Sequence, residues 1–355
     1  MLEDKATEIR TGEELDSDKL QSFLQTKIES FGQIIKILQF PGGYSNLTYQ
    51  IETKNQKYVL RKPPKGAENI KGGHNMQREY NILKSLQNAN FKKIPKPILF
   101  SDDLSIIGSE FYLMEKMEGV ILRSANFKTQ KAELNPKKME MLSINLCETL
   151  AQLHKIDLEK SGLLNLGKPE GYIERQVNGW FERYNKSKTD EISEFELVYK
   201  WLVANMPKEI KPTLIHNDFK YDNVVINFET NKIIAILDWE MTTIGDPRMD
   251  IGTSLSYWCE PNDGEFEKTF NLTWLPGNLN REDFVQLYQK TNPIDLSEIL
   301  YFYVFGLFKN AIVIQQIYSR FKKGLTQDTR FSNLGFGVKI LIKKALNSIE
   351  SKKMK

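Results

Sequence analysis

The chain has 355 residues, 40% of them hydrophobic and 27% charged, which is typical of a folded globular protein and excludes a disordered or fibrous one. Its formal net charge of +3 gives no reason to expect a nucleic acid or an anionic membrane as a partner. The length exceeds that of one compact core and suits two lobes formed by a continuous chain.

The sequence favours a soluble protein in the cytoplasm. Its first residues alternate charges and lack the apolar core of a secretion signal. Cys147 and Cys259 are too few to staple a chain of this length, so we expect two buried thiols in a reducing compartment. Residues 299–317 are the most apolar stretch, but Lys309 and Asn310 interrupt it, which predicts a buried core helix rather than a membrane span.

Residues 1–117 are predicted to form a small lobe built on an antiparallel sheet. Apolar residues at helical spacing begin the lobe, and three β-like runs follow as a meander whose first turn is rich in glycine. A helix and two further runs complete a sheet of about five strands. The predicted elements are a helix over residues 14–31, strands over 34–40, 47–53 and 57–61, a helix over 76–86, and strands over 97–100 and 111–117.

Residues 118–355 are predicted to form a larger, mostly helical lobe, which makes the fold class α+β. One short β segment is set into this helical region, and its strands begin or end at polar residues. The predicted elements are helices over residues 139–153, 172–184, 195–206 and 296–321, and strands over 213–216, 224–226 and 233–237.

Two polar clusters border these short strands. In the first, Asp218 is followed by Lys220 and then by Asn223, just before a strand, and in the second Asp238 ends a strand. Phosphoryl transfer requires a residue that orients the acceptor hydroxyl, oxygen ligands for Mg²⁺ and cations that hold phosphates. A polar surface turn has the same composition as either cluster alone. Both clusters together, in this order, favour a catalytic site.

The order and spacing of these motifs resemble the protein-kinase-like superfamily, and more closely the aminoglycoside phosphotransferase and choline kinase group. Asp238-Trp239 and the later residues 245–250 fit that group better than protein kinases. The resemblance implies a bilobal protein-kinase-like fold with ATP and Mg²⁺ as cofactors. It departs at Asn217, where the group usually has glycine.

The resemblance also implies a role for each motif residue. Asp218 orients the acceptor hydroxyl, Lys220 contacts the γ-phosphate, and Asn223 and Asp238 bind Mg²⁺. Three further polar residues are expected to be structural: His216 bonds to backbone, Asp246 begins a helix, and Asp250 braces the backbone of the catalytic loop.

On the nucleotide side, Arg61 takes the place of the lysine on the third kinase strand, since Val59 and Arg61 share a face by alternation. Lys62 faces the other way and is the second choice. Glu79, on the following helix, is the expected partner of Arg61. A glycine-rich turn between the first two strands is expected to close over the phosphates with its backbone N–H groups. It consists of Gly42, Gly43, Tyr44, Ser45 and Asn46.

Residues 111–119 resemble a kinase hinge, with Met114 behind the adenine. Backbone groups of Glu115 and Met117 would then bond the base. Because backbone makes these contacts, an ordinary edge strand would have the same sequence.

Four segments resemble the phosphotransferase domains fused to acyl-CoA dehydrogenases: residues 59–64, 77–80, 171–177 and 305–311. That branch is implicated in phosphorylating hydroxyacyl-CoA substrates, so the expected partner is a small-molecule hydroxyl acceptor of this kind. Six residues are candidates for an acceptor pocket, although their spacing also fits core packing. They are Tyr172, Arg175, Gln176, Trp180, Trp258 and Trp274, and Arg175 is the expected contact for a phosphate or carboxylate.

Three other functions stay open. An antibiotic kinase for polycationic aminoglycosides is less favoured, because the C-terminal part has no dense acidic cluster. A regulatory pseudokinase is disfavoured because Asp218, Asn223 and Asp238 are all present. A protein kinase is disfavoured because Gly245 follows Asp238 so closely that little room remains for a peptide-binding activation segment.

Overall fold

The structure is a computed structural model that describes residues 5–41, 46–64, 74–326 and 331–355. The chain divides into two compact units, each made of several segments. The first unit comprises Met1–Ile121, Lys160–Leu163 and Asn223–Met241, and the second comprises Leu122–Glu159, Leu164–Asp222 and Thr242–Lys355. The chain therefore crosses between the units directly after Asp222, in the middle of the predicted catalytic motif.

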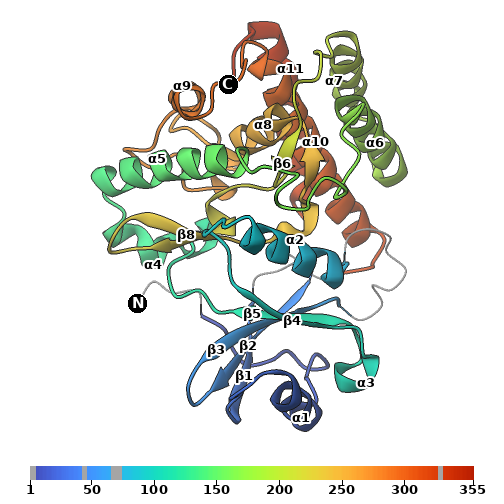
Figure 1. Cartoon of the computed structure of the whole chain (residues 1–355). Helices are drawn as coiled ribbons and strands as arrows, with labels where there is room; N and C mark the ends of the chain where they lie inside the picture. The colour runs from blue at the N-terminus through green and yellow to red at the C-terminus, as the bar shows by residue number, and fades with distance from the viewer. Residues whose placement is uncertain (1–4, 42–45, 65–73, 327–330) are drawn as a thin grey trace. The chain divides into compact units, whose positions relative to one another are not determined.

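The first unit contains a five-stranded antiparallel sheet with the strand order β1-β2-β3-β5-β4, as the sequence predicts (Figure 1). The alternation of β3 divides its side chains between the two faces. Tyr58 and Leu60 join an apolar cluster with Leu20 and Leu24 of the first helix, while Arg61 lies on the opposite face. The elements are α1 (Ser17–Lys27), β1 (Ile34–Gln39), β2 (Leu47–Thr53), β3 (Lys57–Lys62), α2 (Met76–Asn88), β4 (Pro97–Ser101), α3 (Leu104–Ile107) and β5 (Phe111–Glu115).

A hairpin of β7 (Val224–Asn227) and β8 (Lys232–Ile236) completes the first unit. Val120 forms a bridge with Ile226 through two backbone hydrogen bonds of 2.8 Å. Gly119 permits this approach, since a Cβ atom there would lie 2.6 Å from the Ile226 carbonyl oxygen. The hairpin thus lies against the segment that leaves β5.

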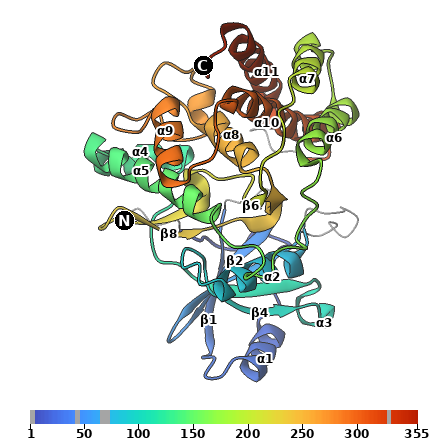
Figure 2. The ribbon, with the colours of Figure 1, turned by 45° about the horizontal axis from the view of Figure 1, so that its top comes forward.

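The second unit is mostly helical, and a long apolar helix lies at its centre between other helices (Figures 1 and 2). Asp246 begins one of these helices, because its side chain accepts the Arg248 N–H and Pro247 occupies the first turn. The main elements are α4 (Phe127–Gln130), α5 (Pro136–Leu153), α6 (Tyr172–Ser187), α7 (Ser193–Ala204), β6 (Thr213–Ile215), β9 (Thr243–Gly245), α8 (Pro247–Tyr257), α9 (Arg281–Thr291), α10 (Ile299–Lys322) and α11 (Leu334–Ser351).

Within the described ranges, α10 is the one helix whose length and hydropathy would allow it to cross a membrane. Of its most apolar 18-residue window, 78% is buried inside the protein. Such burial is what a core helix shows, as the sequence analysis predicts.

The grouping of the short strands in the sequence analysis was wrong. Instead of one β segment, the structure has two separate two-stranded sheets, in which β7 pairs with β8 and β6 pairs with β9. The sequence analysis missed β9 because three residues are too short to show a periodicity.

The backbones of α8 and α10 approach closely at two glycines. A Cβ atom on Gly252 would lie 2.2 Å from the Phe302 carbonyl oxygen, and one on Gly306 would lie 2.5 Å from the Gly252 carbonyl oxygen. We expect Gly252→Ala to lower the free energy of unfolding by about 1–3 kcal/mol, because a packed backbone must move. Urea unfolding followed by circular dichroism measures the change.

Gly179→Ala on α6 is the matched control, since a Cβ atom there would meet only Arg183 Nη1 at 4.0 Å. Alanine favours a helix, so this variant should be unchanged or more stable. Equal stability of the two variants would contradict the close approach of α8 and α10.

Candidate active site

In the first unit, Arg61 pairs with two carboxylates. Its Nη1 lies 3.2 Å from Glu79 Oε2, and its Nη2 lies 3.1 Å from Asp238 Oδ1. Tyr112 donates a hydrogen bond of 2.9 Å from its hydroxyl to Glu79 Oε2. β3 and α2 therefore bring together the two residues that the sequence analysis paired, and the loop after β8 adds Asp238.

Burial shifts the pKa values of Arg61 and Glu79 in opposite directions, because it disfavours the charged form of each side chain. Burial disfavours the charged form of Arg61, but the fields of Glu79 and its other acidic neighbours together outweigh burial and raise the pKa of the guanidinium. Burial also raises the pKa of Glu79, against the attraction of Arg61. The guanidinium stays a cation that two carboxylates hold in place, and that arrangement suits a phosphate contact.

Asn46 links the end of the glycine-rich turn to this group. Its Nδ2 donates to Glu79 Oε1 at 3.2 Å and to Glu240 Oε2 at 3.1 Å. The Glu240 carbonyl accepts a hydrogen bond of 3.2 Å from Arg78 Nη1. The sequence analysis did not predict a site role for Glu240, which lies two residues after Asp238. The other predicted turn residues, Gly42, Gly43, Tyr44 and Ser45, lie outside the described residues.

Asn223 and Asp238 are the predicted Mg²⁺ ligands, and both lie in the first unit. The Leu237 N–H donates to the Asn223 carbonyl oxygen at 2.8 Å, so the residue before Asp238 lies against Asn223. Asp238 adopts a left-handed φ of 65°, and its side chain is 34% exposed. Such a backbone is uncommon for a residue other than glycine and is often found at functional sites.

This pair suits Mg²⁺ through its donor atoms. One carboxylate and one amide oxygen are hard ligands, and Mg²⁺ commonly takes only one or two protein carboxylates together with waters and phosphates. Among the described residues there is no group of three or more His, Cys, Asp or Glu side chains that could hold a metal ion. The ion would therefore complete its coordination with phosphate and water oxygens.

The predicted hinge follows β5. The Glu115 N–H donates to the Lys96 carbonyl at 2.9 Å, so the backbone group of this residue that remains for an adenine is the carbonyl. Met117 packs with an apolar cluster that contains Val225 and Ala235 of the β7–β8 hairpin. Lys62, the second choice for the phosphate contact, points elsewhere and donates to the Ile107 carbonyl at 3.3 Å.

In the second unit, Asp218 and Lys220 form an ion pair. Lys220 Nζ lies 2.8 Å from Asp218 Oδ1 and 4.3 Å from the centre of the Tyr257 ring, and both charged side chains are 19% exposed. The loop that follows β6 thus presents a carboxylate and an ammonium group side by side. These are the groups that acceptor orientation and phosphate contact require.

The electrostatics of the pair keep both groups charged. Burial disfavours the Asp218 carboxylate, but Lys220, Lys309 and His216 together outweigh burial and lower the pKa of Asp218. Burial likewise acts against the Lys220 ammonium, but Asp218, Tyr257 and Asp222 together outweigh burial and raise the pKa of Lys220. Asp218 is therefore an ionised acceptor of hydrogen bonds at neutral pH.

Asp250 braces the backbone of this loop, as the sequence analysis predicts. Its Oδ2 accepts the His216 N–H at 2.6 Å, and its Oδ1 accepts the Asn217 N–H at 2.8 Å. His154 Nε2 lies 3.0 Å from Asp250 Oδ2. Burial opposes ionisation of Asp250, but these donors outweigh it and lower its pKa. The sequence analysis missed His154, which lies 96 positions before Asp250 and has no local motif.

Asn217 stands where related loops have glycine, and its φ is 66°. Its side chain contacts the Tyr172 hydroxyl, with Nδ2 at 3.2 Å and Oδ1 at 3.4 Å. Asparagine tolerates the left-handed region better than most residues. This departure from the family pattern therefore keeps the turn and adds a contact to α6.

The six candidates for an acceptor pocket do not share one place in the second unit. Tyr172, Trp180 and Trp258 lie near the predicted catalytic loop, since the Trp258 ring packs on Tyr221 of that loop with its centre 6.4 Å away. Trp274 instead packs on Phe127. Arg175 of α6, the expected phosphate or carboxylate contact, instead donates to the backbone carbonyls of Lys168 and Glu170 in the loop before α6. Gln176 accepts the Trp180 indole N–H at 3.2 Å.

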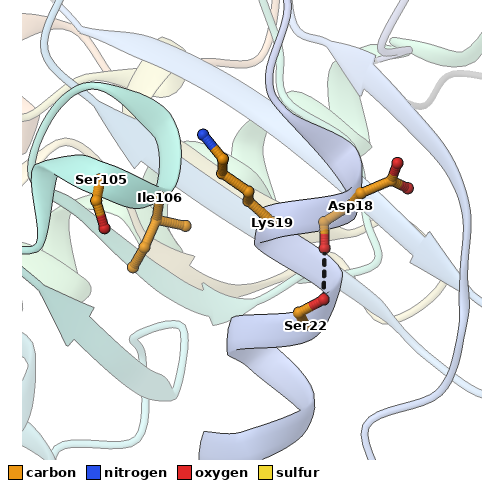
Figure 3. Close-up of a pocket in the computed structure, with 5 residues that line it drawn as sticks. All are labelled: Asp18, Lys19, Ser22, Ser105 and Ile106. Carbon is orange, nitrogen blue, oxygen red and sulfur yellow. Dashed lines mark hydrogen bonds between the residues drawn. The ribbon is translucent and has the colours of Figure 1, made fainter.

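Two surface depressions lie away from the predicted site residues. One lies in the first unit between α1 and α3, where Ser22 donates to the Asp18 carbonyl (Figure 3). Its lining residues are Asp18, Lys19, Ser22, Ser105 and Ile106. The other lies in the second unit beside Glu209 and Asp246. Neither contains a residue that the sequence analysis assigned to the site.

The buried Arg61–Glu79 pair yields a stability prediction. Their side chains are 10% and 2% exposed, so Arg61→Met leaves an uncompensated buried carboxylate. We expect the free energy of unfolding to fall by about 3–5 kcal/mol, and Arg61→Met with Glu79→Met to recover most of the loss. Urea unfolding without nucleotide measures this.

The exposed Lys200–Glu196 pair provides the control, since its side chains are 68% and 64% exposed. Lys200→Met should change the free energy of unfolding by less than about 1 kcal/mol. If Arg61→Met is as mild as this control, the ion pair does not stabilise the first unit.

Comparison with known proteins places these motifs in a family. The sequence model of the phosphotransferase enzyme family matches residues 36–285. Acyl-CoA dehydrogenase family member 11 of Gallus gallus is 31% identical over 334 residues, which are 91% of this chain and 42% of that protein. The Homo sapiens protein of the same name is 31% identical over 91% of this chain and 41% of its own length. The chain spans less than half the length of these relatives.

Solved structures share the fold. A protein from Ralstonia eutropha, described as a candidate aminoglycoside phosphotransferase, superposes with a TM-score of 0.80 at 25% identity. The match covers 95% of this chain and 99% of the Ralstonia chain. The complex of an aminoglycoside 2″-phosphotransferase with streptomycin and ATP superposes with a TM-score of 0.56 at 18% identity, over 85% and 90%. The small antiparallel sheet and the mostly helical remainder are common to these proteins. This chain belongs to the phosphotransferase enzyme family and has the kinase-like fold of the aminoglycoside phosphotransferases.

Proposed function

We propose that this chain is a small-molecule kinase that transfers the γ-phosphoryl group of ATP to a hydroxyl group of a metabolite. The observation that carries the proposal is the contact of Asp218 with Lys220 at 2.8 Å, on a loop that Asp250 holds through two backbone amides. A rigid loop with a carboxylate and an ammonium group suits a reaction whose catalysis is mostly positioning and charge stabilisation.

Each residue has a proposed part in the transfer. The Asp218 carboxylate accepts the hydrogen bond of the acceptor hydroxyl and takes its proton as the oxygen attacks the γ-phosphorus. The bond from the γ-phosphorus to the β–γ bridging oxygen breaks at the same time, and ADP leaves with that oxygen and the electron pair. Lys220 and Arg61 hold phosphate oxygens, while Asn223 and Asp238 would hold Mg²⁺. When it is bound, the ion supplies positive charge against the phosphates and their developing charge.

The nucleotide assignment rests on the first unit. Arg61, held by Glu79 and Asp238, lies on the face of the sheet opposite to its apolar cluster with α1. Related structures are described as complexes with ATP and with ADP. We infer that this face receives the phosphates, and that the backbone near Glu115 and Met117 contacts the base.

For the acceptor, we propose a hydroxyacyl-CoA or a similar hydroxylated metabolite. The relatives at 31% identity are named as acyl-CoA dehydrogenase family members, and this chain matches only a part of each. A kinase part next to a dehydrogenase that acts on acyl thioesters is consistent with a hydroxylated acyl thioester as substrate. The second candidate is an aminoglycoside, because the structural relatives include aminoglycoside kinases.

The test is a product assay. The protein is incubated with Mg-ATP and a panel of hydroxyacyl-CoAs, aminoglycosides, choline and sugars, and phosphorylated product is identified by its mass. Product that depends on a hydroxyacyl-CoA supports the proposal, and product with an aminoglycoside alone shifts the acceptor class. Nucleotide binding without turnover of any acceptor would favour a regulatory pseudokinase. The absence of nucleotide binding would refute the kinase proposal.

A further inference from the structure

Lys309 is a charged residue in the apolar core of the second unit. It lies in the middle of α10, and only 3% of its surface is exposed. Its neighbour Phe308 is fully buried. Burial of an ammonium group is costly unless it is paired and hydrogen-bonded. The sequence analysis used this residue only as an argument against a membrane span, and the proposed chemistry does not include it.

The partner of Lys309 is the catalytic loop. Its Nζ donates a hydrogen bond of 2.6 Å to the Asn217 carbonyl oxygen, across 92 positions of sequence. That carbonyl belongs to the peptide that joins Asn217 to Asp218. The N–H of the same peptide donates to His216 Nδ1 at 3.3 Å. Both polar atoms of the peptide before Asp218 are thus held by side chains.

The left-handed turn explains why a side chain is needed here. At φ 66°, Asn217 departs from regular strand and helix geometry, and a buried carbonyl there needs a hydrogen-bond donor. The amides of His216 and Asn217 already donate to Asp250. A long donor from α10 satisfies the carbonyl, and its charge makes the bond short and strong.

The charges around Lys309 come from several elements. Asp218 and Lys220 of the loop, Asp250 of α8 and Arg183 of α6 all act on its ammonium, and the centre of the Trp180 ring lies 5.8 Å from Nζ. Burial lowers the pKa of Lys309 to about 8, while Asp218 and Asp250 act in the opposite direction. At neutral pH the group is still mainly a cation.

We propose that Lys309 is a positioning residue for phosphoryl transfer, whose ammonium fixes the peptide between Asn217 and Asp218 and thereby aims the Asp218 carboxylate at the acceptor hydroxyl. The inference rests on the proposed function, because it takes Asp218 as the group that orients the acceptor. Lys309 touches neither substrate nor nucleotide in this role. Its effect passes through the loop backbone.

The test compares Lys309→Met, Lys309→Arg and the wild type. Methionine keeps the length and removes the donor and the charge, so kcat should fall about 10²-fold, the loss that a misplacement near 1 Å can cause. The dissociation constant for Mg-ATP should stay within about twofold, because the nucleotide groups lie in the first unit. Arginine restores a charged donor, so Lys309→Arg should be clearly more active than Lys309→Met.

The pH profile supplies a readout that a structural role would not move. Wild-type kcat should decline above about pH 8 as Lys309 loses its proton, and the decline should move to higher pH in Lys309→Arg, whose guanidinium stays charged. Lys344→Met is the matched control, since Lys344 Nζ also pairs with buried carboxylates of the second unit, those of Asp263 and Glu267. It should lower the urea midpoint and leave kcat unchanged.

Several outcomes would overturn the proposal. The first is a Lys309→Met variant whose kcat stays within about threefold of the wild type. The second is a Lys309→Met variant that loses kcat, Mg-ATP affinity and urea midpoint in parallel. The third is a Lys309→Arg variant that is no more active than Lys309→Met. Asp218→Asn separates this proposal from the proposed function. If the wild type is active, Asp218→Asn is inactive and Lys309→Met is fully active, only the role of Lys309 is refuted. If the wild type neither phosphorylates any acceptor of the panel nor hydrolyses ATP, both proposals are refuted.

Discussion

Asp218→Asn should lower kcat by about 10²–10⁴-fold, the usual contribution of a positioned general base. The amide has nearly the shape of the carboxylate, so the loop held by Asp250 should keep its fold. The amide cannot take the proton of the acceptor hydroxyl, and it also removes the partner of Lys220 at 2.8 Å. Mg-ATP binding should change only a few-fold, which separates a loss of chemistry from a loss of binding.

The pH dependence of this carboxylate follows from its shifted pKa. The charges around Asp218, Lys220 first among them, outweigh burial and lower its pKa. In the folded protein the carboxylate therefore stays ionised from neutral pH to below about 4, the ordinary pKa of an aspartate. The stability that the ion pair contributes is fully present above the unfolded pKa and is lost as pH falls through the lower folded pKa. We therefore expect kcat not to fall between pH 7 and pH 5 through this group.

Asp295→Asn is the control for the first prediction. Its side chain accepts the Ser297 N–H at 2.9 Å and takes no part in the proposed site, so kcat should match the wild type. If Asp218→Asn retained the kcat of this control, Asp218 would not be the residue that orients the acceptor.

Asp238→Ala should lower kcat at least about 10²-fold, since it removes the only carboxylate proposed for Mg²⁺ and preorganised charge is a large part of such catalysis. The change also takes one of two carboxylate partners from Arg61. A chelator should abolish wild-type turnover. The informative measurement is kcat as a function of Mg²⁺ concentration.

Asp238→Asn refines the test of the ion. Asparagine keeps one oxygen ligand and loses the charge, so its activity should lie between alanine and wild type and should respond to higher Mg²⁺. Glu265→Gln is the control, because this carboxylate is 91% exposed and pairs only with the side chain of Lys268. An Asp238→Ala variant with the Mg²⁺ dependence of the wild type would remove Asp238 from the metal site.

Local patterns predicted most elements of both units. The run of residues 47–53 is β2, and the helical spacing from Met139 to Leu153 lies within α5, because alternation and a period of 3.6 are set by neighbours in sequence. The motif at 216–223 placed Asp218 and Lys220 two positions apart, and the structure adds that they form an ion pair. The residues at 42–45 remain a prediction.

Long-range contacts were harder to predict. The sequence analysis paired Arg61 with Glu79 alone and did not predict its contact with Asp238, 177 positions away. No pattern indicated that Asn46 would reach Glu240, 194 positions away. Arg175 was expected to contact a phosphate or carboxylate, but in the structure its guanidinium donates to backbone carbonyls of the loop before α6. A residue type alone does not reveal which donor or acceptor will be nearest in space.

The sequence by itself determined the family, the small sheet, the main helices, the candidate catalytic motif and its brace by Asp250, because periodicity and motif spacing are local properties of the chain. Only the tertiary structure decided the rest of how the motif is held: the left-handed turn at Asn217, the contact of His154 with Asp250 and the contact of Lys309 with the peptide before Asp218. These contacts join α8, α10 and the loop after β6. They arise when the helices pack, and that packing depends on side-chain shapes from distant segments rather than on any local pattern.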